Sequence, residues 1–298
     1  MRRLPAVFSK QVRRLSWRTG QGHAELTAES QRGKVLSSAT LASKQLLTPS
    51  TVELRFQIEN PLFDFQSGQW VDCFIPGVTE IGGFTIVTPP DKLPELHLAV
   101  KGGSTHAPTV AAHSAKVGDV WQMRAGGDFQ MKDSTRNMLF LAGGIGINPL
   151  IAMLREHSLR CGWNEDHEEG ESEKRRRVIL LHSARNTEEL AFREELIKMA
   201  ANSREAFHYV PWVTRGGDGT KRFDVSDIEI QLEILGRPGS SVEFDMGTSS
   251  SVNTYSSVDV VSGCGTLFSV LYPVRHCSIL TFALCLSSAV CMWATVDG

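Results

Sequence analysis

The stretch LFLAGGIGINPLIAML, residues 139–154, decides the fold of the second half of this chain. It opens with a continuous apolar run, which is typical of a strand buried on both faces. A glycine-rich turn follows at 143–146, and Pro149 then stands near the start of a segment with helical character. A diphosphate group needs this order of elements, because the unpaired N–H groups and the positive dipole end of a helix attract anions.

A tight packing turn is the alternative interpretation, since Gly-Gly-x-Gly alone is a short pattern. The strand before it and the helix after it favour nucleotide binding. The pattern differs from the GxGxxG fingerprint, so the sequence does not predict a Rossmann dinucleotide fold of that type.

Strand and helix signals alternate beyond this point. Residues 178–181 indicate a second buried strand, and residues 187–200 indicate a helix that begins with a cap and first-turn acids. Residues 207–214 indicate a third strand, although Pro211 is unusual inside one. The alternation predicts an α/β domain with a parallel sheet that begins near residue 137. The charged residues 164–177 between the first helix and the second strand are expected to form a solvated loop.

The first half carries a different pattern. Val52, Leu54, Phe56 and Ile58 alternate with polar neighbours, which indicates a half-buried strand. Turn residues separate this strand from further strand signals at 69–75, 83–87, 96–100 and 119–124. Short strands with turns between them predict an antiparallel barrel or sandwich. The boundary between the two domains falls at about 130–137.

Composition narrows the class of protein. The chain has 298 residues, of which 41% are hydrophobic, and this content excludes a wholly disordered chain. Its 31 basic and 33 acidic residues give no nucleic-acid signature. The six cysteines form no CxxC pair and no zinc-type spacing with histidine, so no metal site is predicted.

The two ends of the chain differ from its body. Residues 1–24 contain six Lys or Arg, no acidic residue and interleaved apolar residues. This pattern predicts a mitochondrial transit peptide, and the alternative interpretation is a disordered basic tail. Residues 277–296 contain no charge and are just long enough to cross a bilayer. Their Ser, Thr and Cys content favours a buried or poorly folded tail over a membrane-associated one.

Several segments resemble the ferredoxin–NADP reductase superfamily. AGGIGINPL is similar to its nicotinamide-dinucleotide turn, and HSARNTEELAFREEL is similar to the next strand and helix. Together with KVLSSA, GQWVDCFIPG and GGFTI, these segments most closely resemble a family of mitochondrial oxidoreductases that contain a NAD-binding domain. The resemblance implies a flavin-binding β-barrel at 34–130 and an incomplete NAD(P)-binding α/β domain at 137–235. A divergent tail at 236–298 lacks the Cys-Gly-Pro-Pro-type turn of the superfamily.

The resemblance also implies a dinucleotide site. Its diphosphate would be wrapped by the residues Gly143, Gly144, Ile145, Gly146, Ile147 and Asn148. Arg185 would lie at the adenosine ribose, where a guanidinium could accept a 2′-phosphate. The alternative for Arg185 is a surface ion pair with Glu188 or Glu189, so NAD and NADP both stay open.

The flavin motif of the superfamily, Arg-x-Tyr-Ser, corresponds to Gly82, Gly83, Phe84 and Thr85. By this match Phe84 would stack on the flavin ring, and Thr85 would take the catalytic position near its reactive nitrogen. Gly82 offers no cation to a flavin phosphate. The alternative for Phe84 is an ordinary inward residue. Lys101, with the polar turn 102–105, is either a substitute phosphate contact or part of a hairpin loop.

The function implied is that of an NAD(P)H-dependent oxidoreductase. Hydride would pass from the nicotinamide to FAD or FMN, and electrons would then pass to an unknown acceptor. The rival hypothesis is a dinucleotide-binding module or scaffold without turnover, and a third is a membrane form anchored by the tail.

Overall fold

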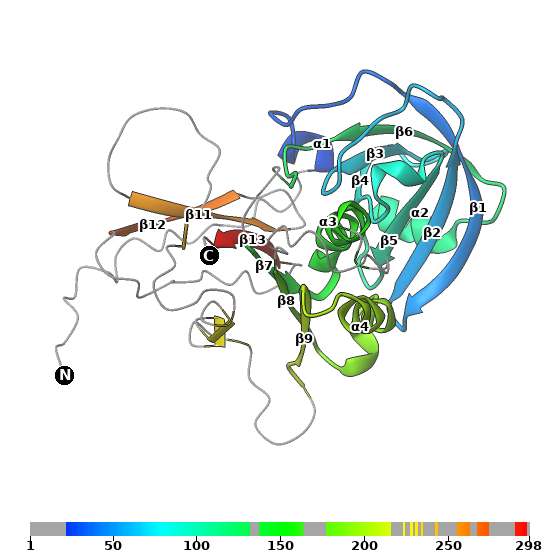
Figure 1. The fold of residues 1–298 in the computed structure, drawn as a ribbon. Helices are drawn as coiled ribbons and strands as arrows, with labels where there is room; N and C mark the ends of the chain where they lie inside the picture. Colours follow the sequence, from blue (N-terminus) through cyan, green and yellow to red (C-terminus); the bar gives the residue numbers. More distant parts are fainter. Residues whose placement is uncertain are drawn as a thin grey trace.

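The computed structural model describes residues 22–131, 137–161, 163, 177–215, 223, 227–228, 230–231 and 234, together with the backbone of 242–243, 255–262, 267–273 and 290–296. Two sheets dominate these residues (Figure 1). The expected two-domain architecture, an antiparallel barrel followed by an α/β unit, is confirmed.

The barrel comprises six antiparallel strands in the order β4-β3-β6-β1-β2-β5. A bridge between Ile86 and Leu98 joins the β4 end of this order to the β5 end. The strands are β1 (Ser37–Thr48), β2 (Thr51–Ile58), β3 (Trp70–Phe74), β4 (Gly82–Thr85), β5 (Glu95–Lys101) and β6 (Val120–Gly126). All strands predicted in this half are present. The signal for β1 was missed, because small and polar residues take the place of large apolar ones along most of it.

Short helices accompany the barrel. They are α1 (His23–Leu26), the 3-10 turn η2 (Pro90–Lys92) and α2 (Ala107–Ser114). The hairpin considered for 102–105 is wrong, because β5 and β6 are not neighbours in the sheet and α2 lies between them. Inside the barrel, Phe56 and Trp121 pack with ring centroids 4.9 Å apart in a continuous apolar core.

The second sheet is built on three parallel strands, β7 (Asn137–Gly143), β8 (Val178–Ala184) and β9 (Phe207–Val213). Both β7 and β8 are almost wholly buried, as their apolar runs predicted. The other edge of β7 pairs antiparallel with β13 (Val290–Val296), so the sheet is mixed overall. Such pairing covers an edge that would otherwise expose unpaired backbone groups.

The remaining tail strands extend the sheet beyond β13. They are β10 (Val242–Glu243), β11 (Tyr255–Ser262) and β12 (Leu267–Pro273), in the order β12-β11-β13-β7-β8-β9 with β10 beside β13. Residues 290–296 of the uncharged stretch are therefore strand. Within the described parts of the chain, no helix is long and apolar enough to cross a membrane.

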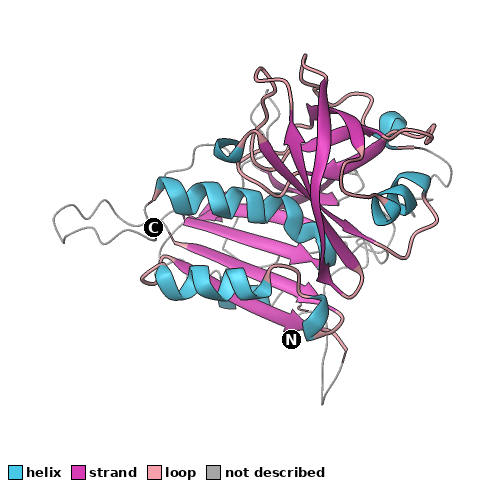
Figure 2. Ribbon diagram, turned by 90° about the vertical axis from the view of Figure 1, so that its right-hand side faces the viewer, coloured by secondary structure: helices cyan, strands magenta, loops and turns pink. Residues whose placement is uncertain are grey.

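Two helices cover one face of the parallel strands (Figure 2). These are α3 (Ile147–Arg160), which follows the 3-10 turn η3 (Gly144–Gly146), and α4 (Arg193–Asn202). The helix predicted for 187–200 begins later than expected. Residues Thr187–Glu189 form the separate 3-10 turn η4, and Phe192 adopts a left-handed φ of 60° that an α-helix cannot continue through.

The two units share a core. Val87 and Ala99 of the barrel are buried in the same apolar cluster as α3 and the parallel strands. This packing fixes the glycine turn at the start of α3 next to β5. The predicted leader up to residue 21 and the charged residues 164–176 lie outside the described residues.

Candidate functional site

The glycine turn connects β7 directly to α3, as expected. Gly144 has a left-handed φ of 54°, a conformation that favours glycine, and a Cβ at that position would meet nothing within 4 Å. Gly143, Gly144 and Ile145 are partly exposed, whereas the three predicted residues that follow, through Asn148, are buried. The open part of the turn is therefore its first half.

The helix that follows is suited to an anion. No side chain caps α3 at Gly146, although the N–H of its first residue, Ile147, already donates to the carbonyl of Gly144 in η3. Pro149 is the third residue of the helix and has no N–H of its own to satisfy. No acidic residue stands in this first turn to oppose a negatively charged ligand.

Asn148 contributes to the site in another way than the sequence suggested. Its Nδ2 donates to the carbonyl of Ala99 on β5 over 2.8 Å, and the side chain is 5% exposed. Its Oδ1 has no hydrogen-bond partner among the described residues. This bond ties α3 to the barrel, and the burial of the side chain leaves the main chain of Asn148 as the part that could face a diphosphate.

A buried histidine lies beneath the turn. His182 on β8 is 0% exposed, and its Nε2 lies 3.2 Å from the carbonyl oxygen of Gly144. Its Nδ1 lies 3.3 Å from the hydroxyl of Tyr209 on β9. Burial lowers the pKa of His182 to about 4, although the bond to Gly144 acts in the opposite direction. The sequence alone gives no signal for this contact, since nothing local links His182 to the turn.

Arg185 is exposed and follows the end of β8. Since Gly143 pairs with Ser183 across the parallel strands, Arg185 lies at the same edge of the sheet as the glycine turn. Glu189, one of its suggested partners, instead accepts a hydrogen bond from Ser50 and lies 3.4 Å from Lys101. The position of Arg185 is compatible with a ribose contact, which stays a prediction.

The flavin motif has a different environment from the one that the resemblance implies. Phe84 is 9% exposed and belongs to the barrel core, on the same face of the sheet as its strand partner Val71. A Cβ on Gly82 would lie 2.8 Å from the Phe84 ring and 2.9 Å from Pro108. The ring thus has the inward position that was the alternative, and stacking on a flavin would require it to leave the core.

The opposite face of β4 is covered by the segment around α1. Thr85, half-buried, pairs with Trp70, and Gly83 pairs with Asp72. The His23 ring lies directly on Gly83, where an added Cβ would come within 2.0 Å of its Nδ1. The same ring meets Trp70 edge-on, with centroids 4.5 Å apart.

Asp72 holds this cover in place. Its carboxylate is 1% exposed and lies 3.0 Å from His23, 3.0 Å from Arg32 and 2.8 Å from Arg124. Burial alone would raise the pKa of Asp72, but the hydrogen bonds from His23, Arg124 and Arg32 outweigh it and bring the pKa to about 2.

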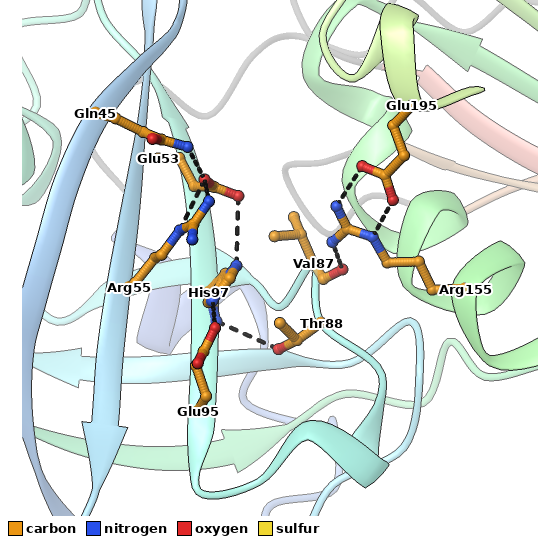
Figure 3. Close-up of polar contacts among 9 residues, drawn as sticks. All are labelled: Gln45, Glu53, Arg55, Val87, Thr88, Glu95, His97, Arg155 and Glu195. Atoms are coloured by element: carbon orange, nitrogen blue, oxygen red, sulfur yellow. Dashed lines mark hydrogen bonds and ion pairs between the residues drawn. The ribbon is translucent and has the colours of Figure 1, made fainter. Parts of the chain in front are cut away.

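A polar network joins the barrel to α3 and α4 (Figure 3). Arg155 donates to the carbonyl of Val87 over 2.5 Å and forms two bonds of 2.7 Å with Glu195. The neighbouring Thr88 accepts a hydrogen bond from the backbone of His97. His97 in turn lies 3.4 Å from the buried carboxylate of Glu53. The loop at 87–88 is therefore held from both sides, which fixes the barrel against the helices.

The described residues contain no cluster of three or more metal-ligating side chains.

Comparison with known proteins agrees with this architecture. Residues 140–235 match the family model described as the oxidoreductase NAD-binding domain. A human relative named Oxidoreductase NAD-binding domain-containing protein 1 is 36% identical over 189 residues, which cover 59% of this chain and 58% of the human protein. The zebrafish (Danio rerio) protein of the same name is 33% identical over 227 residues, covering 71% of this chain and 76% of that protein.

The chain belongs to the family of Oxidoreductase NAD-binding domain-containing protein 1. It spans a little under three fifths of the length of its human relative. The solved structure of ferredoxin-NADP+ reductase from Plasmodium falciparum with 2′P-AMP shares its fold, with a TM-score of 0.54 at 16% identity, over 66% of this chain and 80% of that one. The family resemblance expected from the sequence is thereby confirmed, and the likeness to the reductase structure confirms the expected fold.

Proposed function

We propose that this chain is an NAD(P)H-dependent oxidoreductase of ferredoxin-reductase type. The dinucleotide would bind at the carboxyl edge of β7–β9, with its diphosphate against the main chain of Gly143–Asn148. The open left-handed turn at Gly144 carries the proposal, together with the uncapped first turn of α3 behind it. The match of residues 140–235 to an oxidoreductase NAD-binding domain supports the same conclusion.

The nicotinamide supplies a hydride when it is bound, and the chain's own residues bind and orient the dinucleotide. Main-chain N–H groups of the turn would hold the diphosphate. The exposed guanidinium of Arg185 would contact the adenosine ribose or its 2′-phosphate, so the preference between NADH and NADPH depends on this residue.

The flavin half of the proposal has less support from the geometry. Phe84 offers no free ring face, Gly82 offers no cation and His23 covers Gly83. The residues present at this motif therefore do not fit a flavin as they are arranged, and we derive no step through one. The superfamily resemblance implies FAD or FMN as the hydride acceptor ahead of an unknown electron acceptor, and the geometry at this motif does not support that part of the proposal.

An absorption spectrum of the purified full-length chain, recorded while NADH and NADPH are added separately, tests both halves. The proposal predicts saturable binding of one of them through the turn and, if a flavin is held, bleaching of its absorption band. A protein that binds neither nucleotide overturns the proposal. A colourless protein that binds nucleotide but takes up no added FAD or FMN overturns only its flavin part.

The second candidate function is a dinucleotide-binding module without turnover. The inward Phe84 and the His23 cover on Gly83 favour it, because they leave the hydride without an evident acceptor site. Measurable oxidation of NADH by ferricyanide, above the rate without protein, would reject this candidate.

Import into mitochondria is a further part of the proposal, and it rests on the basic, acid-free residues 1–24. A fluorescent fusion of the full chain should co-localise with mitochondria, and deletion of residues 1–21 should leave it in the cytosol. An unchanged location after this deletion would contradict the proposal.

A further inference from the structure

His182 is the buried titratable side chain closest to the proposed site that the proposed function leaves without a role. It lies on the middle strand of the parallel set and bridges both neighbours. Its two ring nitrogens face Gly144 at the end of β7 and Tyr209 on β9. Burying a polar side chain costs free energy unless the side chain is hydrogen-bonded, and both ring nitrogens of His182 have a partner.

The chemistry of its two partners fixes the state of the ring. The carbonyl of Gly144 can only accept, so Nε2 of His182 carries the proton and donates. The pKa of His182, lowered by burial to about 4, keeps the ring neutral at pH 7. Its Nδ1 is then an acceptor, and the Tyr209 hydroxyl donates to it. Tyr209, His182 and the turn thus form one directed chain of hydrogen bonds.

The orientation of one peptide unit depends on this chain. In a planar trans peptide the C=O and the N–H point in opposite directions, so the Ile145 N–H points away from His182. The Ile147 N–H also donates to the Gly144 carbonyl, which directs that carbonyl along α3. The Ile145 N–H therefore points out of the open side of the turn. Glycine at position 144 can adopt both left-handed and right-handed φ values, so the bond from His182 adds a second restraint on this peptide beside the one from Ile147.

We propose that His182 is a positioning residue for dinucleotide binding: its Nε2–H holds the Gly144–Ile145 peptide in the orientation that presents the Ile145 N–H to a diphosphate. This inference rests on the proposed function. It assigns to a β8 side chain the task of organising main-chain donors that belong to the turn after β7.

Two substitutions separate this role from simple packing. His182→Gln keeps an amide donor close to the place of Nε2, whereas His182→Leu keeps the volume and removes the donor. We expect His182→Leu to weaken NADH or NADPH binding about tenfold, since one hydrogen bond to the turn is worth about that factor. His182→Gln should restore affinity to within about threefold of the native chain.

His113 provides a matched control. Its Nε2 also bonds a backbone carbonyl, that of Val100 at 3.0 Å, but it lies on α2 of the barrel. His113→Leu should leave nucleotide affinity unchanged. Thermal unfolding of every variant separates lost stability from lost affinity. Equal affinity of His182→Leu and the native chain overturns the inference, as does a loss that follows stability and is not rescued by glutamine.

The native chain offers a test that needs no variant. In ¹H–¹⁵N spectra of the full-length protein, the Ile145 amide signal should shift strongly on addition of NADH or NADPH, whichever binds. Binding that leaves this signal in place overturns the inference while the proposed function stands. Absence of binding by either nucleotide overturns the proposed function instead, and this inference with it.

Discussion

Two glycines of this chain are required for different reasons. Gly144 is needed for its conformation, because its φ of 54° is left-handed while the space around it is open. Gly83 is needed for space, because the His23 ring occupies the place of a side chain. Each reason predicts a different outcome when a side chain is added.

At Gly144 a valine should strain the backbone without a steric clash. We expect Gly144→Val to lower the free energy of unfolding by about 1–2 kcal/mol, the usual cost of a left-handed non-glycine residue. NADH or NADPH binding should weaken as well, because the added side chain narrows the open side of the turn. Calorimetric titration and chemical denaturation measure the two effects.

Gly77 is the control for strain alone. It has a φ of 78°, equally open surroundings and a place in the barrel loop after β3. Gly77→Val should cost a similar free energy of unfolding and leave nucleotide affinity as it is. If both valine variants bind nucleotide as the native chain does, the turn at Gly144 is not the binding site.

At Gly83 an alanine should expel the ring of His23 from β4. The hydrogen bond from His23 to the buried Asp72 is then lost, and we expect the free energy of unfolding to fall by about 1–3 kcal/mol. Gly22→Ala, with open space and an ordinary φ of −77°, should be almost neutral. Denaturation curves that do not distinguish the two variants would show that the His23 contact does not contribute to the free energy of unfolding.

At the scale of elements, the spacing of apolar residues predicted those strands whose own sequence carries a clear pattern. The apolar run of β7 and the alternation in β2 correspond to strands almost residue for residue. The start of α4 was missed because tertiary packing buries Leu190 and Phe192 and forces a left-handed residue into an otherwise helical pattern. The strand β1 was missed because it gains its stability from two neighbours and not from its own composition.

Arg155 links elements that periodicity cannot relate. Its side chain is 18% exposed and joins Val87 of the barrel to Glu195 of α4. Arg155→Met should lower the free energy of unfolding by about 2 kcal/mol, since hydrogen bonds to charged groups contribute about 1.5–3 kcal/mol. Arg160, on the same helix, pairs with Glu156 and is 60% exposed. Arg160→Met should cost less than about 0.5 kcal/mol, and similar losses in both variants would contradict the proposed link.

At the scale of the whole molecule, the site depends on contacts between segments far apart in the sequence. The glycine turn was predictable because strand, turn and helix are contiguous. The positions of His182 under Gly144 and of His23 on Gly83 were not predictable, because pairing of β7 with β8 and docking of α1 on β4 create them. The inward orientation of the Phe84 side chain follows from the register of β4 on β3, and a motif match gives no information on that register.

Acid should destabilise the whole molecule in two stages. The pKa of His182 is depressed in the fold from 6.5 to about 4, so the unfolded chain binds the extra proton first. Stability present above pH 6.5 is therefore lost as the pH falls toward 4, by up to about 3 kcal/mol. Glu53 and Asp72, with pKa values near 2, add a second loss as the pH falls below about 4. Denaturation at a series of pH values should show both stages, and His182→Gln should remove the first.

A crystal structure of the full-length chain grown with NADH or NADPH tests the central claim most directly. We predict that the diphosphate lies against Gly143–Asn148, within hydrogen-bonding distance of the Ile145 N–H, with the adenosine toward Arg185. A dinucleotide bound with its diphosphate at any other surface would contradict the account.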